Sequence, residues 1–144
     1  MLNQRKIMQI REISLKELDV AYEVIKELRA LSYIEFEDLI YDMRHQEYKI
    51  IGLFTKEELH TYAGVSVQTN LYHKKHLYIY DLVTKTKSRS KNYAKEMLIY
   101  LEDYAKINQC QNIVLSSGFS REDAHRFYEN LGFTKKSFLF LKEV

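Results

Sequence analysis

Residues 81–94 read DLVTKTKSRSKNYA and join a β-strand pattern to the start of an amphipathic helix through a basic loop. From Leu82 to Lys95 there are five lysines or arginines and no acid. The free backbone N–H groups at a helix N-terminus bind anions, and the helix dipole favours negative charge there. The loop is therefore a candidate phosphate site. A solvated lysine-rich connection and a nucleic-acid-binding patch are the alternatives.

The segments on either side of this loop predict a mixed sheet. Before it, alternating residues predict an antiparallel meander of three strands, at Tyr48–Phe54, Tyr62–Gln68 and His76–Thr84. After it, apolar residues at helical spacing predict a helix over about 91–107. The apolar run NIVLS at 112–116 then reads as a buried strand. A strand, helix and strand in this order imply a parallel crossover.

The two ends of the chain add further elements. Ser14 and Glu17 form a capping box that predicts a first helix over about 14–30, and a second helix with an acidic surface follows it. Near the C-terminus, Ser120 is expected to cap a helix that Gly132 ends, and residues 133–141 are expected to form a final strand. The predicted fold class is α/β, with a mixed, mainly antiparallel sheet, a parallel βαβ crossover and helices on both faces.

Length and composition favour a single domain over residues 1–144. Hydrophobic residues make up 46% and charged residues 29%, a globular balance that excludes disordered and fibrous chains. No apolar run approaches the roughly 20 residues that span a bilayer, and the N-terminus does not resemble a signal peptide. The lone Cys110 permits no internal disulfide. We therefore expect a soluble cytoplasmic protein without a membrane partner.

A metal site is not expected. His73 and His76 are close in sequence, but they lie in a predicted turn without a nearby third ligand.

Two ordered motifs, RSKNYA at residues 89–94 and AHRFYENLGF at residues 124–133, resemble those of the GNAT superfamily of N-acetyltransferases. Residues 89–94, RSKNYA, resemble the family motif Arg/Gln-x-x-Gly-x-Gly/Ala, with Asn92 where glycine is usual. Residues 124–133, AHRFYENLGF, resemble the family segment Ala-x-x-Phe-Tyr-Glu-x-x-Gly-Phe. The resemblance extends over about 78–133 and is sharper to a bacterial subgroup with Asp-Leu-Val-Thr, Arg-Ser and Ala-His-x-Phe-Tyr segments.

The resemblance implies that the basic loop holds the pyrophosphate of acetyl-CoA, the acyl donor. Asparagine tolerates the left-handed backbone region better than other non-glycine residues, so Asn92 is expected to keep the shape of the loop. The cofactor-binding residues implied are Leu82, Val83, Thr84, Arg89, Ser90, Lys91, Asn92, Tyr93 and Ala94.

The resemblance also assigns catalytic roles. An alkyl ammonium is almost wholly charged at neutral pH, so a group must remove its proton, and Asp81 is the candidate, with a structural aspartate as the alternative. A backbone N–H at Val83 or Thr84 is expected to stabilise the oxyanion, where the strand bulges away from its parallel neighbour. Tyr128 is the candidate acid for the leaving thiolate, and a core aromatic residue is the alternative.

The predicted reaction moves an acetyl group to a primary amine by direct attack in a ternary complex. The first two helices border the acceptor site in the family, so Glu35 and Asp38 are candidates for binding a cationic acceptor. The alternative is that these acids only form a solvated helix face. The acceptor is a small-molecule or peptide amine. A homodimer is left open, as is a non-catalytic, regulatory CoA-binding role. A nucleic-acid partner is not expected, because the basic segment lacks dense aromatic interleaving.

Overall fold

The computed structural model describes residues 7–144, which fall into two compact units. The first unit ends at Val114 and contains nearly the whole sheet with helices α2, α3 and α4. The second unit runs from Leu115 to Val144 and contains helix α5.

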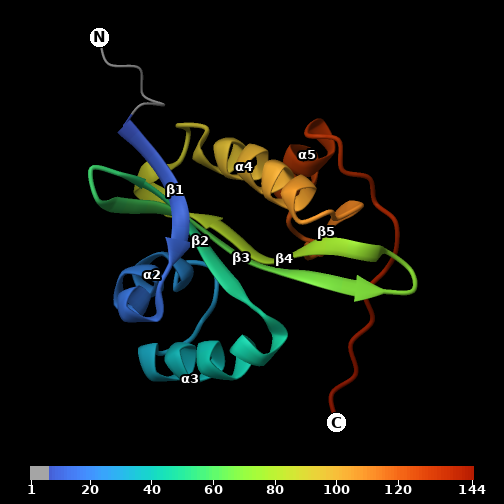
Figure 1. Cartoon of the computed structure of the whole chain (residues 1–144), viewed down its shortest axis with the longest axis horizontal. Helices are drawn as coiled ribbons and strands as arrows, with labels where there is room; N and C mark the ends of the chain where they lie inside the picture. Colours follow the sequence, from blue (N-terminus) through green and yellow to red (C-terminus); the bar gives the residue numbers. More distant parts are fainter. Residues whose placement is uncertain (1–6) are drawn as a thin grey trace. The chain divides into compact units, whose positions relative to one another are not determined.

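The sheet has five strands in the order β1-β2-β3-β4-β5, which is also their order along the chain (Figure 1). The first four strands are antiparallel neighbours, and β5 lies parallel to β4 after a helical crossover. The predicted meander and crossover are therefore confirmed. The first strand was not predicted, because its sequence MQIREI is short and lacks a regular apolar alternation. The strands are β1 (Met8–Ile13), β2 (Lys49–Thr55), β3 (Glu58–Asn70), β4 (Lys74–Thr84) and β5 (Asn112–Leu115).

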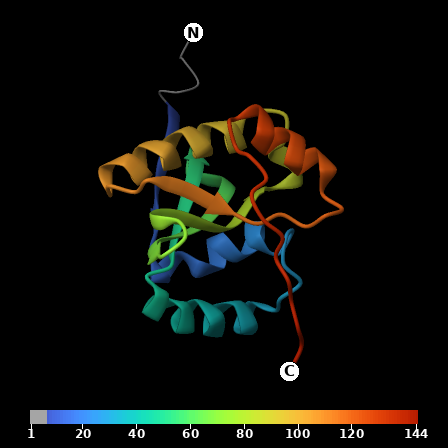
Figure 2. The same ribbon diagram turned by 90° about the vertical axis from the view of Figure 1, so that its right-hand side faces the viewer.

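Helices cover both faces of this sheet, as the sequence predicts. Figure 2 shows α4 on one face and the pair α2 and α3 on the other. The capping box at Ser14 is present, but the first helix begins as the 3-10 turn η1 (Leu15–Glu17) and is shorter than expected. The other elements of this unit are α2 (Leu18–Ile25), α3 (Tyr33–Met43), the 3-10 turns η2 (Arg44–Gln46) and η3 (Thr86–Ser88), and α4 (Tyr93–Ile107).

The core lies between the sheet and its helices. On one face, Leu18 of α2 and Phe36 of α3 are buried in one cluster with Tyr62 of β3. On the other face, Met97 and Leu101 of α4 are fully buried. Removing such apolar surface from water contributes about 1.5–3 kcal/mol per large side chain, so this packing holds the helices against the sheet.

A β-bulge interrupts β4 close to its end. Gly64 of β3 lies opposite Asp81, whereas the next residue, Val65, lies opposite Ile79, so Tyr80 is an extra residue without a partner. Gly64 and Val65 are adjacent in β3 and therefore point to opposite faces of the sheet. Their partners Asp81 and Ile79 also point to opposite faces, although residues two apart in a regular strand share a face. The bulge turns Asp81 to the face that α2 and α3 cover.

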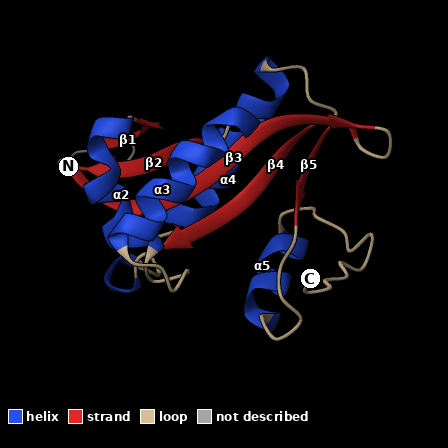
Figure 3. Cartoon of the chain, turned by 90° about the horizontal axis from the view of Figure 1, so that it is seen from below, coloured by secondary structure: helices blue, strands red, loops and turns tan. Residues whose placement is uncertain are grey.

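The second unit differs from the prediction in two places. Helix α5 (Glu122–Asn130) begins after Arg121, and the Ser120 side chain does not cap it. The chain turns after the helix at Gly132, where φ is +95°, as expected. Residues 133–141 form no strand, so that prediction was wrong (Figure 3). A strand needs the backbone hydrogen bonds of a neighbour, and within this unit the described residues provide none.

Candidate active site

The loop between β4 and α4 enters the helix through residues with left-handed backbone conformations. Ser90 and Asn92 both lie in the left-handed region, at φ values of +68° and +62°. Asn92 precedes the first turn of α4, whose amides have no partner within the helix. A left-handed residue followed by a right-handed one, as Asn92 is followed by Tyr93 of α4, turns their N–H groups toward one point and favours an anion there. The loop residues Arg89, Ser90, Lys91 and Asn92 are exposed, whereas Tyr93 is buried and Ala94 is half-buried.

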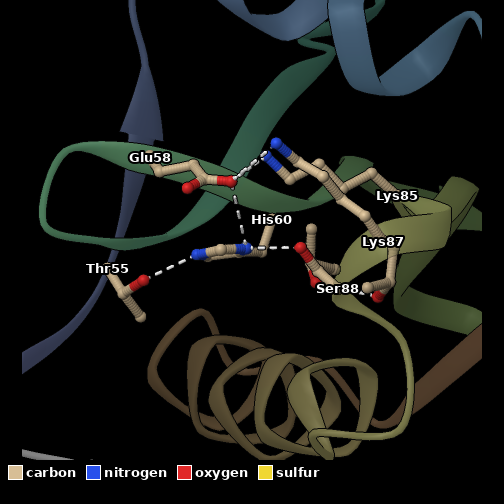
Figure 4. Close-up of polar contacts among 8 residues, drawn as sticks. Thr55, Glu58, His60, Lys85, Lys87 and Ser88 are labelled. Atoms are coloured by element: carbon tan, nitrogen blue, oxygen red, sulfur yellow. Dashed lines mark hydrogen bonds and ion pairs between the residues drawn. The ribbon is translucent and has the colours of Figure 1, made fainter.

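Two acids missed by the sequence analysis hold this loop in place. Glu58 accepts from Lys85 at 2.5 Å and pairs with Lys87 at 3.4 Å, as Figure 4 shows. These lysines, Lys85 first, lower the pKa of the Glu58 carboxyl to about 2. Glu27 accepts from the backbone N–H of Thr86 at 2.8 Å and from its hydroxyl at 2.7 Å. These partners lie 27 and 59 residues away from the loop positions that they bind, so no local sequence pattern indicates them.

The loop keeps unpaired positive charge nevertheless. Among the described residues, Arg89, Lys91 and Lys95 have no salt-bridge partner, and the Arg89 side chain makes one backbone hydrogen bond, to the Thr84 carbonyl at 3.3 Å. Charge-assisted hydrogen bonds from such groups to phosphate are stronger than neutral ones. The exposed part of the loop therefore fits the pyrophosphate that the sequence motif predicts.

Asp81 lies near the end of β4 and has both carboxylate oxygens hydrogen-bonded. Oδ1 accepts from Arg29 Nε at 2.8 Å, and Oδ2 accepts from the Tyr48 hydroxyl at 2.7 Å. The Arg29 guanidinium also donates to the Tyr80 carbonyl at 3.0 Å. The Asp81 side chain is 14% exposed, and that of Arg29 is 49% exposed. Arg29 thus covers Asp81 from the solvent side.

A buried pair of tyrosines supports Asp81 from the other side. The hydroxyls of Tyr48 and Tyr62 lie 2.9 Å apart. Burial, the neighbouring tyrosine and the Asp81 charge raise the pKa of Tyr48 well above its ordinary value. Tyr48 therefore keeps its proton and donates it in a hydrogen bond to the carboxylate.

Gly64 makes the Tyr48 contact with Asp81 possible. A Cβ atom at Gly64 would lie 1.8 Å from the Tyr48 hydroxyl oxygen and 2.4 Å from its ring carbon Cζ. Only glycine leaves room for the ring beside Asp81.

The backbone amides at the end of β4 differ in direction. The Lys85 N–H donates to the His60 carbonyl of β3 at 2.9 Å. Successive amides of a strand point to opposite sides, so the Thr84 N–H points away from β3 and the Val83 N–H points toward it. On the side away from β3, Gln111 donates to the Lys75 carbonyl just before the four-residue strand β5 begins. Such a short strand cannot accompany β4 as far as Thr84. The bulge of β4 at Tyr80 faces β3 and is a separate feature from the expected parting of β4 and its parallel neighbour at Val83 or Thr84.

The remaining predicted residues lie on helices. Tyr128 is a residue of α5 whose ring makes edge contacts with Phe127 and Phe133. Burial raises its pKa above the ordinary value, so its hydroxyl is protonated at neutral pH. Glu35 is the N3 residue of a capping box at Ser32, and Asp38 is exposed on α3. The structure gives Glu35 a local role in starting α3.

A groove of about 750 Å³ contains none of the predicted site residues, but Tyr48, the partner of Asp81, lines it together with Glu12, Lys49 and Tyr104. Residues 7–144 include no group of three or more histidine, cysteine, aspartate or glutamate side chains arranged to hold a metal ion. Within the same range, no helix has the length and apolar character needed to cross a bilayer.

Comparison with known proteins identifies the class. Residues 10–133 match the acetyltransferase (GNAT) family, and the chain belongs to this family. It is 35% identical over 134 residues to the uncharacterized N-acetyltransferase YhdJ of Bacillus subtilis (strain 168), a match that covers 91% of this chain and 94% of that protein. The chain is thus an N-acetyltransferase, and acetyltransferases of this family use acetyl-CoA.

Solved structures share the fold. The aminoglycoside N-acetyltransferase AAC(6')-Iy in complex with CoA superposes with a TM-score of 0.83 at 10% identity, over 95% of this chain and 94% of that one. Glucosamine-6-phosphate N-acetyltransferase from Arabidopsis thaliana gives a TM-score of 0.75 at 19% identity, over 94% and 97% of the two chains. The predicted mixed α/β fold is confirmed.

Proposed function

We propose that this chain transfers the acetyl group of acetyl-CoA to a primary amine by direct attack in a ternary complex. The observation that carries the proposal is the arrangement at the end of β4, where Asp81 lies three residues before Thr84 and the anion-binding loop follows directly. The proposed proton acceptor and the proposed pyrophosphate loop thus belong to the same end of one strand. The proposal includes a single N-acetyltransferase domain over residues 1–144, located in the cytoplasm.

The loop residues bind the donor in this proposal. The backbone N–H groups of residues 89–94 and the Arg89 guanidinium hold the pyrophosphate, with Lys91 adding positive charge. Leu82, Val83 and Thr84 line the path of the pantetheine arm beside the strand. Of the two amides expected to stabilise the oxyanion, the direction of the N–H groups favours Thr84.

Asp81 accepts the proton that the acceptor ammonium must lose before attack. An ammonium ion carries the same charge as the Arg29 guanidinium, and it replaces Arg29 at Oδ1, while Tyr48 keeps Oδ2 in position. The amine nitrogen then bonds to the thioester carbon, and the carbon–sulfur bond breaks. Tyr128 gives its proton to the leaving thiolate, and the nitrogen loses its second proton through water, which returns a proton to Tyr128.

The acceptor is a small-molecule or peptide amine. Of the two proposed acceptor-binding acids, Asp38 is the freer, because Glu35 already bonds the start of α3. We propose that Asp38 attracts the cationic acceptor, with Glu35 adding charge from the same helix.

A screen of amine acceptors with detection of the released CoA thiol tests this function. With the acceptor found, Tyr128→Phe keeps the ring contacts and removes a proton transfer that is typically worth 10²–10⁴-fold in rate. We expect kcat to fall by at least tenfold while the melting temperature and acetyl-CoA affinity stay near the wild-type values. The matched control is Tyr72→Phe, which changes an exposed tyrosine outside the site.

Two results would contradict the proposal. A loss in kcat of less than about threefold for Tyr128→Phe, with chemistry limiting the rate, refutes the acid role. Saturable acetyl-CoA binding without turnover on any amine instead favours the non-catalytic CoA-binding alternative.

A further inference from the structure

His60 of β3 is a buried histidine with both ring nitrogens hydrogen-bonded. Its Nδ1 lies 2.6 Å from the Ser88 hydroxyl and its Nε2 lies 2.6 Å from the Thr55 hydroxyl (Figure 4). The whole residue is 5% exposed and Ser88 is 2% exposed. Neither residue belongs to the sequence motifs of the family, and nothing in the proposed reaction uses them.

The His60 side chain contacts the anion-binding loop at both of its ends. Ser88 is the last residue of η3 and directly precedes Arg89. Tyr93 follows Asn92, and its ring stacks on the imidazole with 4.8 Å between the ring centroids and 30° between the planes. The exposed residues 89–92 therefore lie between Ser88 and Tyr93, which both contact the His60 imidazole ring.

The backbone of His60 adds a third contact to the same loop, because its carbonyl accepts from the Lys85 N–H. Two non-glycine residues of this loop, Ser90 and Asn92, hold left-handed conformations, which cost conformational energy. A loop in such a conformation persists only where its surroundings fix it. His60 provides this restraint at the start, the middle and the end of the segment 85–93.

The charge state of His60 suits a structural restraint. Burial lowers its pKa, and the nearby Lys85, Lys91 and Lys87 act in the same direction, whereas Glu58, 3.9 Å away, raises it. A neutral imidazole has one N–H donor and one acceptor, and the hydroxyls of Thr55 and Ser88 serve either kind of partner. Both ring nitrogens are therefore satisfied without a buried charge.

We propose that His60 is a positioning residue that holds residues 89–92 in the anion-binding conformation before acetyl-CoA arrives. The inference rests on the proposed function, in which this loop binds the pyrophosphate. Ordering the loop in advance removes a cost that binding would otherwise include, so His60 acts on donor affinity. It touches neither the acceptor nor the reacting atoms, and kcat at saturating acetyl-CoA does not depend on it.

Two variants test the restraint. Ser88→Ala removes the hydroxyl alone, and His60→Phe keeps a ring against Tyr93 while it removes both hydrogen bonds. We expect each to raise the acetyl-CoA Kd, measured by calorimetry, by about three- to tenfold, the effect of one or two lost hydrogen bonds. KM for acetyl-CoA rises equally and kcat stays unchanged. In the protein alone, the amides of residues 85–93 exchange hydrogen faster.

The matched control is His76→Phe. His76 is also a buried histidine, 3% exposed, but its Nδ1 bonds to the Lys74 carbonyl at the opposite end of β4. This variant is expected to lose stability without changing the acetyl-CoA Kd or the exchange of residues 85–93. If His60→Phe does not fold, Ser88→Ala decides the question alone, because it alters a single atom group.

The possible failures are distinct. If wild-type protein binds acetyl-CoA and both test variants bind it within twofold of the wild type, the positioning role is wrong and the proposed function stands. If wild-type protein does not bind acetyl-CoA, the proposed function fails. Amide exchange of residues 85–93 then still decides whether His60 restrains the loop. Faster exchange in Ser88→Ala supports the restraint, and unchanged exchange refutes it.

Discussion

Substitution of Gly64 by alanine is expected to disrupt the support of Asp81. The added Cβ would lie 1.8 Å from the Tyr48 hydroxyl oxygen and 2.4 Å from Cζ, far inside contact distance. The backbone at Gly64 is held in the sheet opposite Asp81, so the tyrosine ring must move. The ring cannot move without breaking its hydrogen bonds to Asp81 and Tyr62.

The expected loss of stability has two parts. Forcing an extra carbon into a packed core costs about 1–3 kcal/mol. Breaking the buried hydrogen bonds of Tyr48 adds about 1–2 kcal/mol. The free energy of unfolding of Gly64→Ala, measured by urea denaturation, should therefore fall by about 2–5 kcal/mol with an unchanged m-value.

A double-mutant cycle with Tyr48→Leu tests the cause of this loss. Leucine lacks the ring atoms that the new Cβ would meet, so Gly64→Ala should cost less than about 1 kcal/mol in that background. Two outcomes would refute the reasoning: a loss below about 0.5 kcal/mol in the wild-type background, or an equal loss in both backgrounds.

Three further predictions concern the loop and one ion pair. Asn92→Gly removes the Cβ penalty at φ +62°, so the acetyl-CoA Kd should fall by about two- to threefold, and weaker binding by calorimetry would contradict this. Arg89→Ala removes an exposed cation from the loop. The Kd should rise and depend less on salt, whereas equal binding across a salt series would move the anion site elsewhere. Hydrogen bonds from Arg11 and from the Ser14 backbone N–H lower the pKa of the Glu17 carboxyl from 4.5 to about 2. Glu17 therefore stabilises the fold above about pH 4.5 and loses this effect as pH falls toward 2. Urea unfolding should show Glu17→Gln less stable than wild type at pH 7, by at most about 1 kcal/mol for so exposed a pair, and equal to it near pH 2.

Local patterns were sufficient to predict most of the fold. The alternation in residues 48–84 and the helical spacing after 91 predict elements that the structure confirms within a few residues. These signals work because side chains on one face of a strand or helix share one environment. The missed strand β1 and the absent strand at 133–141 show the limit, since strand formation depends on a partner elsewhere in the chain.

The candidate site was predictable only in part. The loop motif indicates residues 89–94, and the left-handed conformation of Asn92 follows from its residue type. The contacts that hold the loop and Asp81 come from Glu27, Arg29, Tyr48 and His60, which lie far away in sequence. Twelve tyrosines make any one of them uninformative in the sequence, so only the structure identifies Tyr48 as the partner of Asp81.

The agreement between strand order in the sheet and strand order in the chain has a consequence for folding kinetics. Strands β2, β3 and β4 each pair with the strand synthesised just before them. The β2–β3 and β3–β4 pairings close short loops, and the segment between β1 and β2 contains two helices. Closing short loops costs little entropy, and chains rich in near-neighbour contacts fold quickly. The meander can therefore assemble stepwise as it leaves the ribosome. The crossover to β5 follows α4 in the chain, and the loop of residues 85–92 has all its contacts with His60 only when β3 and α4 have met.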